Sequence, residues 1–272
     1  MIVISMLLAA VLATAASGAP RDEGWRTPVP GLEVRTMDGS AVTRKGSPAI
    51  IVVRVDPARW RVDVFHHAAS GDRPADAAAW MKRTGATVMF NAGQYYPDKI
   101  PMGLFVKDGK NLGTPLLKQW KGLLVAEPQG APGARRADIL DLQFDAFDVA
   151  TSPYRTAVQS FMLIDRTGAR RVRRSDWHAN RTLLATDDRA RLLVLHTEGA
   201  CTLWELAGWI HDSDLAIRHA LSLDGGFESQ LAIQAGSFAY ASWGGWHVDG
   251  RGDHSLPGVR MALPAAIGLF PR

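Results

Sequence analysis

Short apolar runs, bounded by glycine, proline and other turn formers, recur along most of the chain. The runs at 49–55 and 60–67 are rich in β-branched and aromatic residues and predict two strands joined by a turn. Helical spacing is confined to two segments, 72–83 and 202–211. Strands that do not alternate with helices predict an α+β fold: a strand-rich mixed sheet or sheets with a few flanking helices, in a single domain. Further apolar runs predict strands near 86–91, 102–110, 121–127, 140–148, 157–165, 180–187, 191–197, 220–224, 230–235 and 262–270.

The chain begins with an apolar segment typical of a secretory signal peptide. Ile2 to Ala16 is a continuous apolar run, and the small residues from Ala13 to Ala19 offer cleavage sites. At about 15 residues the run is shorter than the ~20 that cross a bilayer, and no second such run follows. We therefore predict a signal peptide at 1–19, no membrane span after its cleavage, and a periplasmic or secreted location.

The rest of the chain divides by composition into two parts. Residues 20–47 are rich in proline and glycine, and Asp38 with Gly39 indicates a hairpin there, so we predict an N-terminal extension. Residues 48–272 carry most of the strand and helix signals and predict one domain. A chain of 272 residues that is 47% hydrophobic can bury a sizeable core.

Charge and cysteine content exclude some classes of protein. Cys201 is the single cysteine, so no disulfide forms within the chain, and its helical spacing with apolar neighbours favours a buried hydrophobe over a nucleophile. A net charge of +4 favours anionic partners but is too small to indicate nucleic acid. The basic run 166–174 could bind a phosphate or polyanion, but it follows a strand across a turn, which favours a solvated hairpin arm.

The histidines do not indicate a metal site. Eight are scattered along the chain without the spacing of a zinc motif, so we predict no metal and no cofactor. In the loop 244–254, acidic residues with His247 and His254 could bind a metal or line a cleft. No segment points to an obligate protein partner.

Candidate chemistry concentrates in ALSLDGGFESQL, residues 220–231. An apolar run ends at Asp224, and the double glycine Gly225-Gly226 lets the backbone approach a ligand closely. Glu228 follows within the same short turn, so two carboxyl groups lie where acid/base or nucleophilic chemistry could be built. The alternative is an ordinary strand-to-turn corner, in which aspartate is a common turn former.

Three other strand ends carry polar residues. Asn91 follows a buried strand and leads into 92–96, Gln159 and Ser160 interrupt an apolar strand, and 180–182 begins the next one. Each signal alone is weak, because asparagine after a strand is usually a turn former and arginine at a strand start is usually solvated.

Taken in order, these segments resemble the phosphodiester glycosidase family over about residues 48–270. The segments are FNAGQYY, MGLFVKDGK, QSFMLID, NRTLLATD, CTLWELA and LSLDGGFESQL. The chain departs from the family pattern at Gln94, Phe161, Met162 and Glu228. The matching positions are Asn91 and Gly93 at a strand end, Gln159 and Ser160 in a Gln-Ser strand, Arg181 and Thr182, and Asp224, Gly225, Gly226 and Ser229 in the double-glycine turn.

The resemblance implies an exported hydrolase that cleaves the sugar C1–O bond of a sugar-1-phosphodiester on a glycan or cell-envelope polymer. A carboxylate can attack or stabilise the oxocarbenium-like state, and a guanidinium can hold the leaving phosphate. We therefore assign Asp224 as nucleophile or base, Glu228 as second acid/base or hydroxyl acceptor, and Arg181 as phosphate clamp. The expected substrate-binding residues are Asn91, Gly93, Tyr95, Gln159, Ser160, Thr182, Gly225, Gly226 and Ser229.

Two alternatives stay open at this point. A non-catalytic glycan- or phosphoglycan-binding protein on the same scaffold would keep Arg181 and the aromatic lining without needing Asp224 chemistry. Cleavage on the phosphorus side would need a metal cluster or a histidine pair, and the sequence offers neither clearly.

Overall fold

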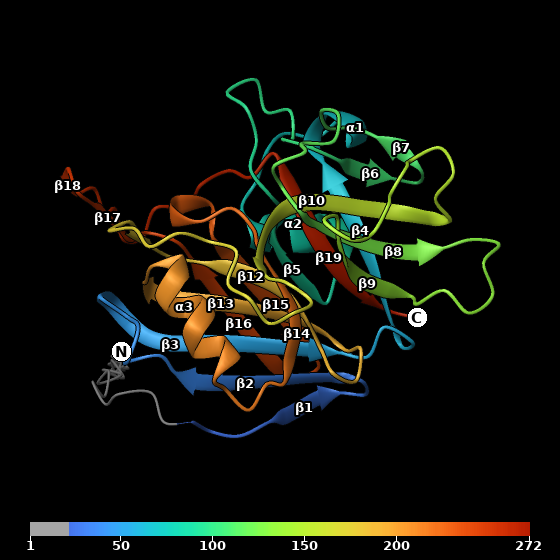
Figure 1. Ribbon diagram of the computed structural model, residues 1–272. Coiled ribbons are helices and arrows are strands. Elements are labelled where there is room, and N and C mark those ends of the chain that lie inside the picture. Colours follow the sequence, from blue (N-terminus) through green and yellow to red (C-terminus); the bar gives the residue numbers. More distant parts are fainter. Residues whose placement is uncertain (1–21) are drawn as a thin grey trace, which may run out of the picture.

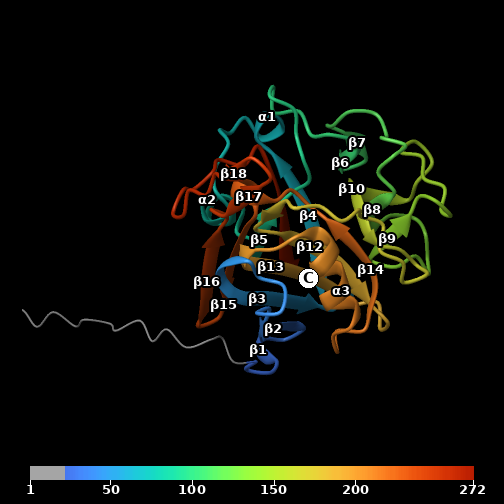
Figure 2. The same cartoon turned by 60° about the vertical axis from the view of Figure 1, so that its left-hand side comes forward.

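The structure is a computed structural model that describes residues 22–272 (Figure 1). Two β-sheets pack face to face, and a helix covers part of the outer face of each (Figures 1 and 2). The predicted signal peptide at 1–19 lies outside the described residues. Among those described, no helix is long and apolar enough to cross a membrane.

The larger sheet has eleven strands in the order β1-β2-β3-β13-β12-β14-β10-β6-β7, with β8 and β9 added at β10. The first half of β10 pairs with β6 and β8, and its second half pairs with β14. Its strands are β1 (Arg26–Val29), β2 (Leu32–Asp38), β3 (Lys45–Val55), β6 (Phe105–Lys107), β7 (Lys110–Asn111), β8 (Gly122–Pro128), β9 (Ala137–Asp141), β10 (Tyr154–Ile164), β12 (Thr182–Asp187), β13 (Leu192–Ala200) and β14 (Ile217–Ser222).

A five-stranded sheet, in the order β16-β15-β5-β19-β4, forms the second layer. Its strands are β4 (Trp60–His66), β5 (Val88–Asn91), β15 (Gln230–Ala235), β16 (Phe238–Trp243) and β19 (Ala265–Pro271). A small third sheet, β11-β17-β18, projects at one end and contains β11 (His178–Ala179), β17 (His247–Asp249) and β18 (Gly252–Asp253). The helices are α1 (His67–Ser70), α2 (Ala77–Thr84), α3 (Leu203–His211) and the 3-10 helix η1 (Gly226–Glu228).

The expected strand-rich α+β fold with few helices is confirmed, but the sheets are not mixed. Every strand pair of the three sheets in 22–272 is antiparallel. Parallel neighbours need a long crossover connection, usually a helix, whereas many neighbours here are joined by short hairpins such as β12–β13 and β15–β16.

The main core fills the space between the two sheets. Apolar side chains from β3, β12 and β13 on one side meet those of β4, β5 and β19 on the other. On the outer face of the large sheet, α3 packs Leu206 and Ile210 against β10 and β14. On the outer face of the five-stranded sheet, α2 packs Trp80 against β5 and β19. Each sheet is therefore packed against the other sheet on its inner face and against a helix on part of its outer face. This packing fixes the positions of the strand ends.

The large sheet includes residues that precede position 48. β2 pairs with β3 along Leu32–Asp38, and β1 pairs with β2 at the edge of the sheet. The turn between β2 and β3 begins at Gly39, whose N–H donates to the carbonyl of Pro48 at 2.8 Å.

Candidate functional site

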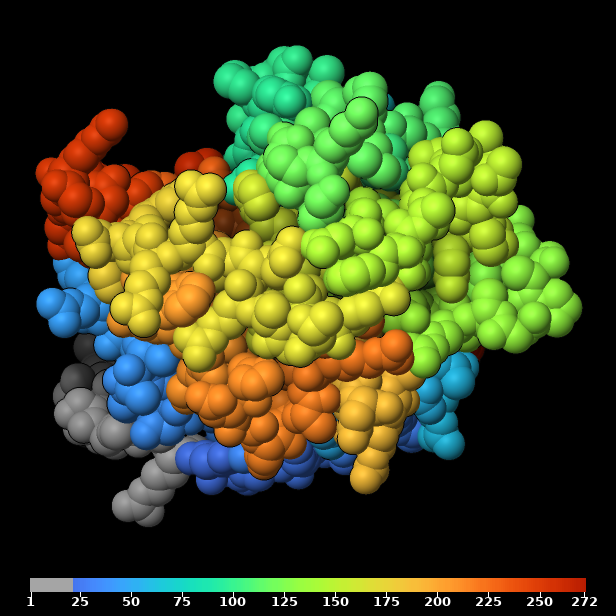
Figure 3. All heavy atoms as spheres, in the orientation of Figure 1, coloured from blue at the N-terminus to red at the C-terminus, as the bar shows by residue number. Residues whose placement is uncertain are grey.

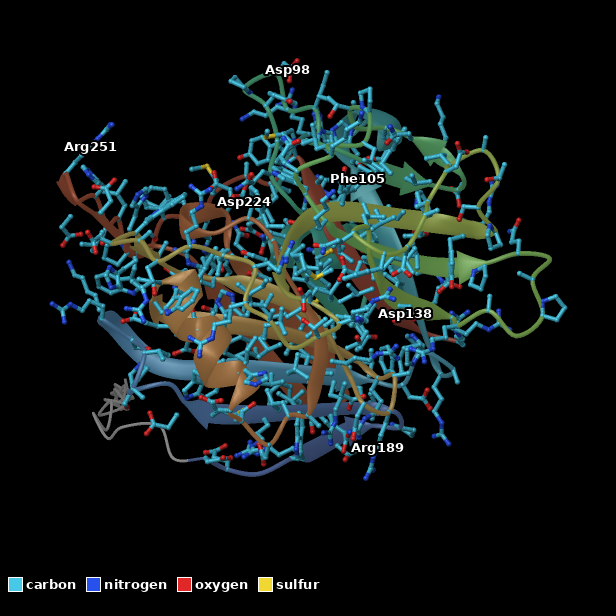
Figure 4. The ribbon with its side chains drawn as sticks, viewed as in Figure 1. Asp98, Phe105, Asp138, Arg189, Asp224 and Arg251 are labelled. Atoms are coloured by element: carbon cyan, nitrogen blue, oxygen red, sulfur yellow. The ribbon has the colours of Figure 1, made fainter. Side chains whose placement is uncertain are left out.

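The double-glycine turn connects the two sheets. β14 ends at Ser222 in the large sheet, and β15 begins at Gln230 in the five-stranded sheet, so residues 223–229 cross from one layer to the other. The N–H of Asp224 donates to the carbonyl of Ala92 at 3.2 Å, which ties the turn to the end of β5. Gly226 has φ +66°, a conformation that favours glycine. Asp224 therefore lies where both sheets end together (Figure 4).

Glycine is required at position 225 because neighbouring atoms lie close to its Cα, and not because of its φ and ψ angles. A Cβ at this position would lie 3.0 Å from the carbonyl oxygen of Asn180 and 3.1 Å from Nη1 of Arg181. The N–H of Gly225 donates to Oδ1 of Asp224 at 3.0 Å. The glycine thus brings the Arg181 guanidinium against the backbone that carries Asp224.

Asn91 fastens β5 to the turn. It is buried, and its Nδ2 donates to the carbonyl of Asp224 at 2.9 Å and to that of Ala92 at 3.0 Å. Its Oδ1 accepts the N–H of Gln230 at 3.0 Å. Because the amide is engaged at both ends, Asn91 positions Asp224 instead of offering donors to a sugar.

Gln159 and Ser160 also act within the protein. Oε1 of Gln159 accepts the N–H groups of Leu104 and Leu117 at 3.2 and 3.0 Å, and its Nε2 donates to the carbonyls of Leu117 and Trp120 at 2.8 Å each. The amide therefore shapes the loop between β6 and β8.

Ser160 and Gly93 hold neighbouring segments together. The Ser160 hydroxyl donates to the carbonyl of Ser222, at the end of β14. A Cβ at Gly93 would lie 3.3 Å from the carbonyl oxygen of Gln159, so the segment after β5 runs closely along β10.

A buried hydroxyl and imidazole network lies beneath the turn. The hydroxyls of Thr182 and Ser229 are 2.8 Å apart, and Ser229 Oγ is 3.3 Å from Nδ1 of His196. Nε2 of His196 lies 2.9 Å from the hydroxyl of Ser242 on β16, so the imidazole bridges the two sheets. Burial lowers the pKa of His196 to about 3, which keeps the ring neutral.

His196 was not singled out from the sequence, and Asn180 was noted only as the start of the strand at 180–182, without a role in the site. His196 stands in an otherwise apolar strand, and a lone histidine there gives no sign of its partners. Asn180 is buried; its Nδ2 donates to the Thr197 carbonyl at 2.8 Å. Its Oδ1 accepts the N–H groups of Gly245 and Trp246 at 2.9 and 2.8 Å, which holds the 244–258 loop beside the turn.

Arg181 lies behind the turn and is only 4% exposed. Its Nε donates to the carbonyl of Cys201 at 3.1 Å, and its Nη2 donates to that of Trp177 at 2.7 Å. No carboxylate oxygen of residues 22–272 lies within 4 Å of this guanidinium. Burial lowers the pKa of Arg181, although Asp224 opposes this shift, and an arginine remains charged at neutral pH.

The two carboxyl groups of the turn differ in environment. Burial raises the pKa of Asp224 to about 7, and the negative charge of Glu228 adds to the shift, while the Gly225 N–H and Arg181 oppose it. Glu228 accepts a hydrogen bond from the hydroxyl of Tyr95 at 3.2 Å. Burial and the nearby carboxylates raise the pKa of Tyr95, so its hydroxyl stays a donor.

Aromatic residues form the rim of the site. The indole of Trp177 is 46% exposed and lies over the guanidinium of Arg181, with 5.2 Å between the ring centroid and Cζ. The ring of His247 lies 5.6 Å from Trp177 and 6.1 Å from Phe227 by centroid distance. Aromatic rings beside carboxyl groups suit the apolar faces of a sugar.

The loop with His247 and His254 was considered for a metal. Both imidazoles face Asp249, with Nε2 to oxygen distances of 3.7 and 3.3 Å. Across residues 22–272, no three His, Cys, Asp or Glu side chains are grouped so as to hold a metal ion.

The twelve residues selected from the sequence gather at one junction, but in two roles. Asn91, Gln159, Ser160, Thr182, Ser229 and Arg181 are buried and bonded within the protein. Asp224, Glu228 and Tyr95 are only partly buried. Glycines at 93, 225 and 226 permit the close approach of backbone segments. The group that can meet a substrate is therefore smaller than the predicted set.

The double-glycine turn thus carries two carboxyl groups at the joint end of two antiparallel sheets, with the buried guanidinium of Arg181 behind it. The family model for phosphodiester glycosidases matches residues 84–268, well over half of the chain. The chain belongs to the phosphodiester glycosidase family, as the resemblance in the sequence predicted.

Solved structures share the fold at low sequence identity. The catalytic domain of zebrafish N-acetylglucosamine-1-phosphodiester alpha-N-acetylglucosaminidase superposes with a TM-score of 0.61 at 15% identity, covering 93% of this chain and 87% of that one. A hypothetical protein from Synechocystis gives 0.57 at 14% identity, with 93% and 64% coverage. A putative exported protein from Burkholderia pseudomallei gives 0.51 at 11% identity, with 85% and 76% coverage. A search of curated proteins found no match.

Proposed function

We propose that this protein is an exported hydrolase that cleaves the sugar C1–O bond of a sugar-1-phosphodiester on a glycan or cell-envelope polymer. The observation that carries the proposal is Asp224, a carboxyl group with a pKa of about 7 held at the junction of both sheets beside Glu228. The family supports the reaction class. The apolar segment 1–19 and the structural relative named as a putative exported protein support export.

Asp224 would act as nucleophile or general base. A carboxylate that holds its proton up to about pH 7 is a stronger base and nucleophile than an ordinary aspartate once ionised. The leaving group is a phosphate monoester, which departs as a stable anion and needs less help from a general acid than an alcohol does. We therefore expect the rate to rise with pH as Asp224 loses its proton, with a midpoint at about pH 7.

Glu228 and Tyr95 would complete the reacting surface. The Tyr95 hydroxyl fixes one oxygen of Glu228 through a 3.2 Å hydrogen bond, which leaves the other oxygen free to accept a sugar hydroxyl or to transfer a proton. Trp177 and Phe227 stand at the rim, where the apolar face of a sugar could lie.

Arg181 would act as a positioning residue more than as a bidentate clamp. Two of its nitrogens already donate to the carbonyls of Trp177 and Cys201, and the third faces Gly225. A fixed positive charge behind the turn stabilises the anionic form of Asp224 and attracts the phosphate. Arg181→Gln removes this charge and should therefore move the midpoint of the pH–rate profile upward as well as lower the rate, whereas Arg181→Lys, which keeps the charge, should leave the midpoint in place.

The decisive experiment measures release of free sugar from UDP-GlcNAc and from the methyl diester of GlcNAc-1-phosphate. We expect Asp224→Asn to reduce turnover at least about a thousandfold, as loss of an essential catalytic group does. Asp188→Asn, at an exposed turn position, is the matched control and should retain full activity. Both enzymes are also assayed with EDTA, because phosphorus-side cleavage by a metal would be sensitive to it.

Each outcome separates the proposal from its alternatives. Sugar release that depends on Asp224 and persists in EDTA supports glycosidase chemistry. Absence of release from a panel of such diesters, with binding intact and unchanged by Asp224→Asn, would instead favour a glycan-binding protein.

A further inference from the structure

Hydrogen bonds continue from the double-glycine turn through the space between the two sheets, beyond the groups that the proposed reaction uses. They join side chains of β12, β13 and β16 with the residue that precedes β15. We call the six residues that they connect the interlayer network. In order along the network they are Thr182, Ser229, His196, Ser242, Tyr240 and Glu198.

The alternation of side chains along β13 directs His196 into the space between the sheets. Leu193 and Leu195 belong to the apolar cluster that α3 covers, whereas Leu192 and Val194 belong to the core between the sheets. His196 continues the second set and meets β16. Figure 3 shows orange residues of α3 at the surface on the outer face, so the network lies on the other side of β13 from this helix.

Glu198 joins the network at a β-bulge. The pairing of β13 with β3 shifts register between Thr197 and Gly199, and a bulge changes the direction of a side chain. Oε1 of Glu198 accepts the hydroxyl of Tyr240 at 2.8 Å. No Lys, Arg or His nitrogen of residues 22–272 lies within 4 Å of this carboxylate. The carboxylate is therefore held by a hydroxyl and not by a cation.

The two ends of the network differ in burial. Thr182 and Ser229 are completely buried beneath the turn. Glu198 is partly exposed, and with Tyr240 it lines a cavity of about 220 Å³ whose other walls include side chains of β2 and β3 and the exposed Glu23. The charge of the Glu198 carboxylate can therefore be hydrated from the cavity, while its hydrogen bond to Tyr240 extends inward.

The Glu198 carboxylate sets the direction of the hydrogen bonds in the network. A carboxylate only accepts, and burial together with the charge of Glu198 raises the pKa of Tyr240, so the phenol keeps its proton and donates it to Glu198. The oxygen of Tyr240 is hydrogen-bonded to Ser242, whose one hydroxyl proton is used there. The hydroxyl oxygen of Ser242 then accepts from Nε2 of His196, 2.9 Å away.

This order of donors makes His196 the Nε2–H tautomer. Burial lowers the pKa of the imidazole to about 3, so the ring holds one proton, and Nδ1 must accept. The nearer donor to Nδ1 is the hydroxyl of Ser229 at 3.3 Å, and Ser229 in turn accepts from Thr182 at 2.8 Å. Without the carboxylate of Glu198, the reverse order, with the proton on Nδ1, would satisfy the same groups.

The buried end of the network bounds the segment that carries both carboxyl groups of the candidate site. The carbonyl of Thr182 accepts the N–H of Leu223 at 3.0 Å, and Ser229 ends the segment before β15. Asp224 and Glu228 lie between these two points. A fixed order of donors at Thr182 and Ser229 therefore holds the two ends of the double-glycine turn in one arrangement.

We propose that Glu198 is a positioning residue for the candidate site: its carboxylate orders the interlayer network, which holds His196 as the Nε2–H tautomer and fixes the ends of the double-glycine turn. Glu198 acts through Tyr240, Ser242 and His196 and does not itself touch the substrate. The inference rests on the proposed function for its effect on the rate, whereas the tautomer of His196 is measured without any substrate.

The test determines the tautomer of His196 by long-range ¹H–¹⁵N correlation spectra of protein labelled with ¹⁵N-histidine. His196→Gln identifies the signals of this ring among the eight histidines. We expect the wild-type ring to carry its proton on Nε2. Glu198→Gln, whose amide both donates and accepts, and Tyr240→Phe, which interrupts the network, should each raise the Nδ1–H form to at least about 10%.

Glu23→Gln is the matched control. It makes the same chemical change at an exposed glutamate that lines the same cavity, where its carboxylate pairs with Arg26 and not with Tyr240. This variant should leave both the tautomer of His196 and the rate of sugar release unchanged. Thermal unfolding of each variant verifies that the protein being measured is folded.

The sugar-release assay measures the consequence for the site. Glu198→Gln and Tyr240→Phe should each lower kcat about tenfold with KM nearly unchanged, because a small displacement of the reacting groups slows the chemical step more than it weakens binding. The double variant should lose no more than either single variant, since both changes interrupt the same network.

The outcomes for the tautomer and for the rate separate this proposal from the proposed function. The proposal is overturned if wild-type His196 carries its proton on Nδ1, if both network variants keep only the Nε2–H form, or if Glu23→Gln shifts the tautomer as they do. If the tautomer changes as expected but no diester is hydrolysed by any of the proteins, the proposed function fails and the ordering of the network by Glu198 stands. If diesters are hydrolysed at an unchanged rate while the tautomer shifts, the positioning role fails and the proposed function stands.

Discussion

Strand β12 carries polar residues at both of its ends, but the two ends differ in the hydrogen-bond partners that surround them. At the site end, the hydroxyl of Thr182 contacts Ser229, and both approach His196. At the other end, the hydroxyl of Thr186 has no hydrogen-bond partner among the described residues, and neither ring nitrogen of its cross-strand neighbour His219 has one. Both threonines are buried.

This contrast indicates where the fold holds its geometry fixed. A buried polar group with partners specifies one arrangement, whereas an unpartnered one only lowers stability. The bonded end places Asp224 between two sheets. Among the described residues, the buried Oδ2 of Asp141 also lacks a hydrogen-bond partner. The end of β12 at Thr186 positions no residue of the candidate site. Hydrogen bonds therefore fix the arrangement of buried polar groups at the double-glycine turn and not at the other end of β12.

The largest effect is expected at Asn91. Replacement by alanine should lower the free energy of unfolding by about 4 kcal/mol, because it leaves the Gln230 N–H and the Asp224 carbonyl without partners in a buried place and removes one of the two donors to the Ala92 carbonyl. Urea unfolding measures the loss, and sugar release should fall with it. Gln234→Ala, which removes an exposed side chain at the far end of β15, should change stability by less than about 0.5 kcal/mol. Equal losses for both variants would contradict this account of the bonded end.

A smaller effect should follow from the carboxyl group of Asp224. In the unfolded chain this group ionises near pH 4, but in the folded protein it keeps its proton to about pH 7, so folding loses stability as the pH rises between these values. Asp224→Asn should therefore be more stable than the parent by about 2 kcal/mol at pH 8, since the partly exposed residue is screened by solvent, and equal to it at pH 4. Denaturant unfolding at the two pH values tests this, and a difference that does not vary with pH would refute it.

The smallest effects compare the two threonines directly. Thr182→Val should destabilise the protein by about 1 to 2 kcal/mol, because the hydroxyls and imidazole around it lose a partner. Thr186→Val removes a hydroxyl that has no partner among the described residues, so stability should stay the same or rise by up to about 1 kcal/mol. The two variants make the same chemical change on the same strand. A loss at Thr186 as large as that at Thr182 would show that the two ends do not differ.

The sequence was sufficient to predict the fold class and most strands, because hydrophobic runs and turn formers act locally. The predicted ends of helices and strands were wrong where a single side chain determines where the element begins or ends. Helix α2 begins at Ala77 because Oδ1 of Asp76 accepts the N–H of Ala79 at 2.8 Å, and not at the earlier Asp72. The run near 140–148 stops being strand at Asp141, whose Oδ1 and backbone carbonyl begin a turn.

For the site, residue types at strand ends predicted which segments meet but not which side chains remain free. Gln159 was expected to orient a sugar, yet backbone groups of the 104–120 loop take all four of its hydrogen bonds. Partners so distant in sequence leave no local pattern. The same reason hid His196 and the role of Asn180, because both depend on segments that the fold brings beside them.

The hydrogen bonds of Asn91 span 133 and 139 positions of the chain to reach Asp224 and Gln230. Contacts between residues so far apart in sequence form slowly during folding, since the entropy of closing a long loop is lost before they exist. The double-glycine turn can take its shape only after strands from both halves of the chain have met. Recovery of catalytic activity during refolding should therefore lag behind recovery of the strand signal in circular dichroism, and activity would report the last step of folding.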